Sequence, residues 1–228
     1  WVGVLALAGC GGGDDGPASS STTAAPVSLE GLTADQVLAK AREAAQAAGS
    51  VRVKGSIAQG DQSIEVDLKL GGVARGSGTV MLDGGRIDLV RVGNDMYFKA
   101  DEKTLTDTVA QGNAQIVTLI AGRYVKATVD TPGFSDFSEL LDFVAFTKGA
   151  LTPAGPITRV AGKPVGGVPT VGLRQEAGTL YVADDGAPYP VRLEPADAPG
   201  GVTMSDWGSE ISIEAPPADQ VIDVGALG

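Results

Sequence analysis

The single cysteine, Cys10, is the residue whose surroundings point most directly to chemistry. It ends an apolar run at residues 1–9 and follows Leu7-Ala8-Gly9. Leu-Ala-Gly-Cys has the form of a lipobox, in which small residues fit a signal peptidase and the thiol accepts diacylglycerol. The run is shorter than the roughly 20 residues that cross a bilayer, so it reads as the C-terminal part of a signal peptide. We therefore expect cleavage before Cys10 and acylation, for example by palmitate, at this residue.

The residues around this cysteine define the expected organisation of the chain. No initiating Met and no basic segment precede Trp1, so we expect the natural chain to start further upstream. Residues 10–28 are rich in Gly, Ser, Thr, Ala and Pro, a composition typical of a flexible linker. Residues 29–228 are long enough for one domain. The expected location is the outer face of the cell membrane, in the cell envelope, with the lipid on Cys10 as the anchor.

The composition excludes several classes of function. The chain has no histidine and one cysteine, and 17 basic against 28 acidic residues give a net charge of −11. Such an acidic chain offers no basic surface for nucleic acid. Without histidine it lacks the commonest general base and a common zinc ligand. We therefore expect no nucleic-acid partner, no metal and no cofactor.

No catalytic motif is complete either. Gly76-Ser77-Gly78 lacks the spacing of a nucleophile elbow, and no histidine is present to activate the serine. Asp184-Asp185-Gly186 is too short for a calcium loop and is typical of a turn. A hydrolase would need two carboxylates facing each other in an open cleft, and no pattern marks which of the acids would form it. The sequence thus favours a protein that is not an enzyme.

The elements that would position any site are one helix, a group of strands, further helices and a second group of strands. Thr33 and Gln36 form a capping-box pattern, apolar residues then recur at helical spacing, and Gly49 ends this first helix. Alternation with a period of two then predicts strands. The predicted strands are 51–57, 64–70, 78–82, 86–92, 96–99, 124–126, 157–162, 168–175, 178–183, 190–194, 201–205 and 210–214.

Between the two groups of strands lies a segment rich in phenylalanine. Residues 116–120 indicate a short helix, and residues 135–146 an amphipathic one. The stripe of this second helix is made by Phe137, Leu140, Leu141 and Val144. The whole pattern predicts an α+β fold with a large antiparallel sheet and helices gathered on one face. A sheet of this size tends to curl, so its apolar face either encloses a cavity or is filled by a solid core.

Two segments resemble a known family. The stretch from Val202 to Asp219, with Ser205-Asp206-Trp207-Gly208 and a proline-rich acidic close, is similar to the end of the LppX/LprG family of mycobacterial and related actinobacterial lipoproteins. The stretch from Leu89 to Lys99 is similar to a strand-turn-strand of that family. The resemblance covers about residues 33–220. The lipobox agrees with it.

The resemblance implies a fold and a function. The fold would be a large curved antiparallel half-barrel with helices packed on its concave face. The function would be binding an acylated lipid or glycolipid in an apolar cavity and carrying it within the envelope, with a membrane transporter as a further partner. Alternation and helix spacing then place these residues in the cavity wall: Ile64, Val66, Leu68, Leu70, Met96, Phe98, Phe137, Leu140, Leu141 and Val144.

The alternative is a non-catalytic interaction or scaffold lipoprotein of the envelope with a solid core. For Trp207, the position between Asp206 and Gly208 favours a turn anchor packed on the sheet over a ligand platform.

Overall fold

The computed structural model describes residues 28–59, 62–82, 84–106, 114–131 and 135–223. Cys10, the predicted signal peptide at 1–9 and nearly all of the predicted linker lie outside these residues. Leu29, the second of the described residues, is fully buried. None of the described helices is long and apolar enough to cross a membrane.

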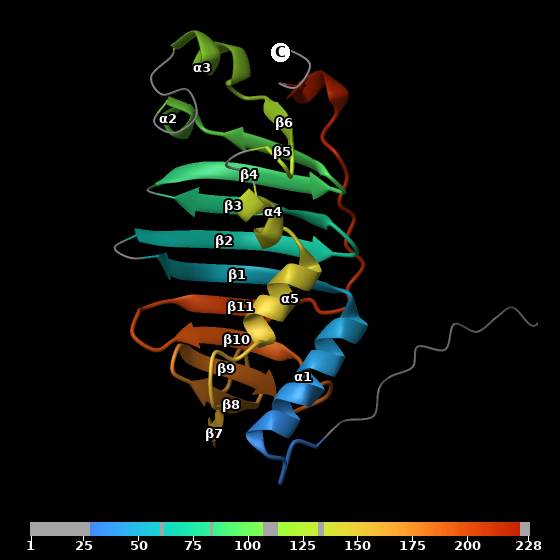
Figure 1. Cartoon of the computed structure of the whole chain (residues 1–228), viewed down its shortest axis with the longest axis vertical. Coiled ribbons are helices and arrows are strands. Elements are labelled where there is room, and N and C mark those ends of the chain that lie inside the picture. The colour runs from blue at the N-terminus through green and yellow to red at the C-terminus, as the bar shows by residue number, and fades with distance from the viewer. Residues whose placement is uncertain (1–27, 60–61, 83, 107–113, 132–134, 224–228) are drawn as a thin grey trace, which may run out of the picture.

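The described residues form an α+β fold that is built on one open sheet of twelve strands (Figure 1). The strand order is β12-β6-β5-β4-β3-β2-β1-β11-β10-β9-β8-β7. All pairs are antiparallel except β12 with β6, which is parallel. The strands β1 to β6 form one meander and β7 to β11 form a second. The two meanders join where Arg52 of β1 lies opposite Ser205 of β11.

The first meander consists of β1 (Ser50–Gln59), β2 (Gln62–Gly71), β3 (Arg75–Leu82), β4 (Gly85–Val92), β5 (Asp95–Ala100) and β6 (Tyr124–Thr128). The second consists of β7 (Thr158–Ala161), β8 (Thr170–Gln175), β9 (Gly178–Ala183), β10 (Pro190–Pro195) and β11 (Gly201–Ser205). The last strand is β12 (Val221–Asp223), after the 3₁₀ turn η2 (Ala218–Gln220). The helices are α1 (Ala34–Ala48), α2 (Glu102–Thr104), α3 (Ala114–Ile120), α4 (Ser135–Leu140) and α5 (Phe143–Leu151).

The first helix forms as its sequence predicts. Thr33 accepts a hydrogen bond from the backbone of Gln36, whose side chain accepts one from the backbone of Thr33. Gly49 ends α1 in the left-handed conformation, at a φ of 69°. The buried face of α1 contains Val37 and Leu38 and is otherwise alanine (Ala34, Ala41 and Ala45). Such small side chains let the helix lie close to its neighbours.

Alternation in the strands divides the sheet into an apolar and a polar face. Val51, Val53 and Leu68 are buried. Arg52 and Lys54, which alternate with the two valines along β1, point to the other face. Helices α1, α4 and α5 lie over the same face (Figure 1). Their buried side chains and those of the apolar face form one hydrophobic core.

Two predictions about elements are wrong. Residues 135–146 form two helices and not one, because the carboxylate of Asp142 accepts a hydrogen bond from the backbone N–H of Ala145 (2.9 Å) and starts α5. Residues 210–214 form no strand. The carbonyls of Ser209 and Ile213 instead accept side-chain hydrogen bonds from Ser50 and Arg75. The segment crosses the ends of the strands and leads to β12, which the sequence did not predict.

Candidate functional site

The space around the C-terminal half of α5 is the first candidate site. One hollow, of about 320 Å³, lies between α1 and α5, with Phe143 and Leu151 among its lining residues. A second, of about 330 Å³, lies between the end of α5 and strands β10 and β11, where Leu193 and Val202 line it. A small space of about 20 Å³ lies near Leu173 and Leu180. Unfilled space thus borders this half of α5 on two sides, and much of its lining is apolar.

The arrangement of α5 is fixed by a few polar contacts. Arg42 of α1 donates two hydrogen bonds to the carbonyl of Leu151, at 2.9 and 2.6 Å, which satisfy a carbonyl at the helix end. At the other end, Asp142 pairs with Arg91 of β4 (3.2 Å), and Arg91 also donates to the carbonyl of Ser138 in α4 (2.6 Å). Arg91 of the sheet therefore fixes the start of α5, and Arg42 of α1 fixes its end.

The mouth of the hollow between α1 and α5 is basic. Arg42, Lys148 and Gln46 line it, and no acidic side chain is among its lining residues. Val144 stands at this mouth and is 60% exposed. In a chain of net charge −11, this hollow has two cations, several apolar side chains and no acid among its lining residues.

The ten predicted cavity residues fall into three groups. Six are buried at 7% exposure or less within the hydrophobic core: Val66, Leu68, Leu70, Met96, Phe98 and Leu141. Three are partly buried against that core: Ile64, Phe137 and Leu140. Of the ten, Val144 alone borders one of the hollows around α5.

The helical spacing placed Val144 on the buried stripe, and its exposure follows from the new start of α5 at Asp142, which buries Phe143 instead. Sequence reasoning missed the residues that do surround α5, because they come from α1, β8, β10 and β11 and have no common spacing. The predicted packing of Trp207 is confirmed. Its ring stacks on Tyr189 at 5.5 Å, and its indole N–H donates to the carbonyl of Pro190.

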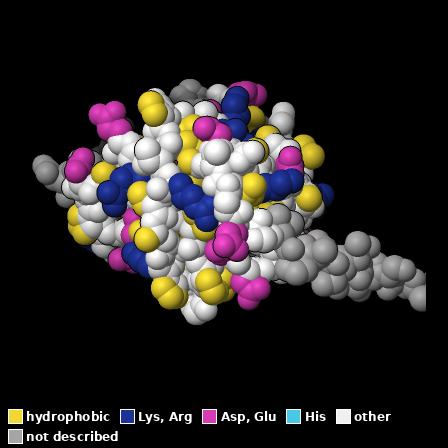
Figure 2. Space-filling view, turned by 90° about the horizontal axis from the view of Figure 1, so that it is seen from below, with side chains coloured by type: hydrophobic (Ala, Val, Ile, Leu, Met, Phe, Trp, Pro, Cys, Tyr) yellow, Lys and Arg dark blue, Asp and Glu magenta, His cyan; other side chains and the backbone are white. Residues whose placement is uncertain are grey.

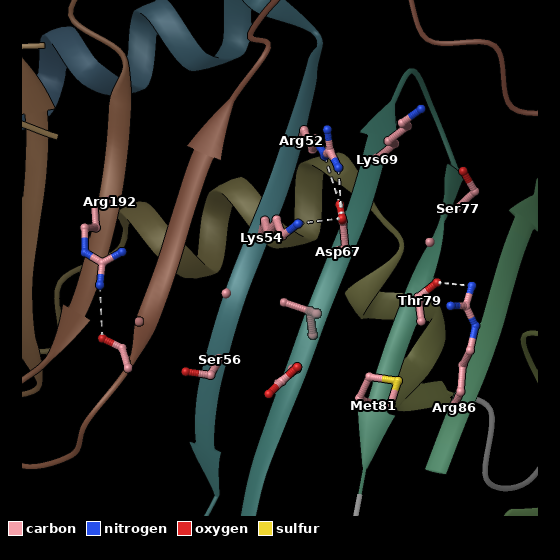
Figure 3. Close-up of a pocket in the computed structure, with 16 residues that line it drawn as sticks. Arg52, Lys54, Ser56, Asp67, Lys69, Ser77, Thr79, Met81, Arg86 and Arg192 are labelled. Carbon is pink, nitrogen blue, oxygen red and sulfur yellow. Dashed lines mark hydrogen bonds and ion pairs between the residues drawn. The ribbon is translucent and has the colours of Figure 1, made fainter. Parts of the chain in front are cut away.

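The polar face of the sheet carries a larger hollow, of about 840 Å³ (Figure 3). Arg52 of β1 donates two hydrogen bonds of 2.9 Å to Asp67 of β2, and the Lys54 ammonium lies 3.4 Å from the same carboxylate. The Arg52 hydrogen bonds are the main reason why the pKa of Asp67 is lowered, and Lys54 adds to them against the opposing effect of burial. Asp67 is therefore ionised at neutral pH.

A further hollow, of about 340 Å³, lies beside β4 and β5, where Lys99 and Gly122 are among the lining residues. Viewed from the end of the sheet at which β7 lies, acidic, basic and small hydrophobic groups are interspersed (Figure 2). The large hydrophobic side chains exposed in the described chain, Val73, Leu119 and Val144, belong to different elements. Among the described residues no three Cys, His, Asp or Glu side chains are placed to hold a metal.

No protein-family model and no curated protein sequence matches the chain.

Proposed function

We propose that this protein is a membrane-anchored lipoprotein that binds the acyl part of a lipid beside α5 and carries the lipid within the cell envelope. The observation that carries the proposal is the unfilled, largely apolar space on two sides of α5. Each hollow is near the lower end of the roughly 300–1,000 Å³ typical of small-molecule sites. The half-barrel of the LppX/LprG family, with helices on its concave side, would provide such a site.

The geometry also supports a direction of entry. Arg42 and Lys148 would meet an anionic headgroup at the mouth between α1 and α5, and the acyl chains would follow Phe143 and Leu151 inward. Arg42 would exchange its bonds to the Leu151 carbonyl for bonds to the headgroup. The end of α5 would then be free to move away from the sheet and join the hollows on its two sides.

The experiment measures lipid in the purified protein. The full chain is expressed with its signal peptide, extracted from membranes, incubated with phosphatidylglycerol vesicles and repurified, and organic extracts are analysed by mass spectrometry. We expect bound lipid in the original protein and much less in Ala150→Trp, since Ala150 lines the hollow beside β10 and β11 and the indole would fill it. Thr118→Trp on the exposed surface of α3 is the matched control and should bind lipid normally.

A second variant keeps the test valid if Ala150→Trp does not fold. Arg42→Met removes the two hydrogen bonds to the end of α5 and should change the rate of lipid uptake. Circular dichroism should show that the sheet is still folded. A folded protein that neither retains nor takes up lipid would disprove the proposal.

A second candidate function is the interaction lipoprotein with a solid core. It is favoured by the burial of Val66, Leu68, Leu70, Met96, Phe98 and Leu141, which pack as in an ordinary hydrophobic core. Under this alternative Ala150→Trp should destabilise the protein and no lipid should copurify with either chain.

The anchor is tested separately. We expect Cys10→Ser to move the protein from the detergent phase to the aqueous phase in a phase-separation assay and to abolish labelling by radioactive palmitate. Cys10→Ser should leave the thermal stability of the domain unchanged, because the hydrophobic core of the described residues is built from positions 29–222.

A further inference from the structure

The hollow on the polar face of the sheet shares only Ser56 and Gly201 with the lining of the hollows around α5. Five basic residues and two acidic residues line it: Arg52, Lys54, Lys69, Arg86 and Arg192, with Glu65 and Asp67. This lining is basic although the whole chain has a net charge of −11. Its volume, about 840 Å³, lies within the range of small-molecule sites.

The pairing of β1 with β2 places two cations directly opposite each other. Arg52 lies across from Lys69, a like-charge arrangement that costs stability in a sheet. Asp67 is shared by Arg52 and Lys54, and Lys69 has no ion pair within the described parts of the chain. The floor of the hollow therefore has more positive charge than its carboxylates neutralise at this point, and a bound anion would relieve the repulsion.

Apart from Asp67, the acidic groups near these cations lie further along β2 or on other parts of the chain. Asp206 acts on Arg52 from beyond β11, and Glu65 lies further along β2, opposite Ser56. Asp88 binds Arg86, and Glu194 binds Arg192 together with Lys163 from outside the hollow. Lys54 is 68% exposed at its side chain, so it and Lys69 are the cations best able to turn to a ligand.

The other lining residues are hydroxyl-bearing residues, glycines and two apolar residues, Val66 and Met81. Ser77 lies opposite Lys69 and Thr79 opposite Asp67 on β3, and glycines line the hollow from β1, β3 and β11. No aromatic side chain is among the lining residues. Aromatic anchors are typical of protein interfaces, and a flat bilayer surface does not fit a hollow. Cations beside hydroxyl groups instead fit phosphate oxygens and the hydroxyl groups of a polyol.

We propose that this hollow binds a soluble polyol or sugar that carries several phosphate groups, with Lys54 and Lys69 as the principal contacts. The principal contacts are separate from the proposed lipid site, because Lys54 and Lys69 line none of the hollows around α5. Either function can therefore fail without the other.

The experiment is a calorimetric titration of the full chain with inositol hexakisphosphate, and with myo-inositol as the uncharged match. We expect saturable binding of the phosphorylated compound, weakened by salt, and none of myo-inositol. Lys54→Gln with Lys69→Gln should weaken binding about a hundredfold, since each of the two lost charge-assisted hydrogen bonds corresponds to about tenfold. Glu65→Gln should strengthen binding because it removes an acid from the lining.

The matched control is Lys40→Gln with Lys99→Gln, which removes the same charge at positions outside the hollow. The original protein and this control should bind equally. Lys69→Gln alone should leave the thermal stability of the free protein unchanged or higher, because it removes the like-charge pair, and a merely structural lysine would not behave so. The proposal is wrong if the control loses as much affinity, if myo-inositol binds as well, or if only anionic vesicles bind.

Discussion

Asp142 connects two parts of the structure with one carboxylate. One oxygen caps α5 at the backbone of Ala145, and the other faces Arg91, whose side chain is 13% exposed. Asp142→Ala removes both interactions and leaves a nearly buried guanidinium without its carboxylate. We expect a loss of roughly 3 kcal/mol in the free energy of unfolding, measured with urea.

Asp142→Asn separates the two roles. Asparagine caps helices about as well as aspartate does, so the loss should be smaller and should come from the missing charge. The nearby Glu139→Ala is the control, because Glu139 is exposed, and it should change the stability by less than about 0.5 kcal/mol. Equal effects of Asp142→Ala and Asp142→Asn would show that the cap does not matter.

Asp67 gives a prediction for pH. Its folded-state pKa is lowered, first by the hydrogen bonds from Arg52, so its contribution to stability is present above its unfolded pKa of about 4. The contribution is lost as the pH falls through the lower, folded-state pKa. We expect the urea midpoint to fall between pH 5 and pH 2, and to fall less in Asp67→Asn.

Other carboxylates titrate in the same range, so Asp67→Asn will not abolish the acid dependence. The pKa of Asp101 is lowered by backbone hydrogen bonds from Thr104 and Arg86, and that of Glu194 by Lys163 and Arg192. If the urea midpoint of Asp67→Asn had the same pH profile as that of the original protein, Asp67 would not contribute to the acid dependence of stability.

At the scale of elements, the close approach of α4 to the sheet depends on a glycine. A Cβ at Gly76 of β3 would clash with the carbonyl oxygen of Leu141, which is backbone and cannot turn aside. We expect Gly76→Ala to displace the end of α4 and to cost about 2 kcal/mol or more, measured by thermal unfolding. Gly149→Ala is the control, because a Cβ there meets nothing within 4 Å, and in α5 it should be neutral or mildly stabilising.

The local elements could be predicted from sequence where their signals are local. The capping box at Thr33 and the alternation in β1 and β2 are contained within one element, and the structure confirms both. The break at Asp142 was hidden because the apolar spacing of residues 137–144 continues through it, while Arg91 of β4 pairs with the carboxylate that starts a new helix. The three-residue strand β12 has too few residues for a period to show.

The residues of the candidate sites could likewise be predicted only where the signal lies within one element. Alternation predicted correctly that Leu68, Leu70 and Met96 face the interior. It could not show whether helices fill that interior, because the answer depends on how closely α1 and α5 approach each other. The opposition of Arg52 and Lys69 depends on the register of a hairpin, which the charges do not reveal by themselves.

At the scale of the whole molecule, the C-terminal segment supplies the edge strand that covers β6. Ile222 of β12 is 9% exposed and belongs to the hydrophobic core, and β12 pairs with β6. We expect Ile222→Ala to cost about 2–4 kcal/mol, measured by urea unfolding. Ending the chain after Pro217 should also increase self-association, measured by light scattering, because it uncovers the edge of β6.

Asp219→Ala, at an exposed position of η2, is the control for the C-terminal segment and should behave like the original protein. A truncated chain that stays monomeric and equally stable would show that β12 contributes nothing to the edge.

The topology has a consequence for the order in which the chain folds. Strands β1 to β6 can pair in succession as they are synthesised, but β11, which pairs with the free side of β1, comes about 150 positions after β1 in the chain. During that interval β1 is an exposed edge beside a hydrophobic core. Charged side chains on edge strands discourage pairing with other chains. Arg52 and Lys54 would thus protect the unfinished sheet from aggregation before they line the hollow of the finished one.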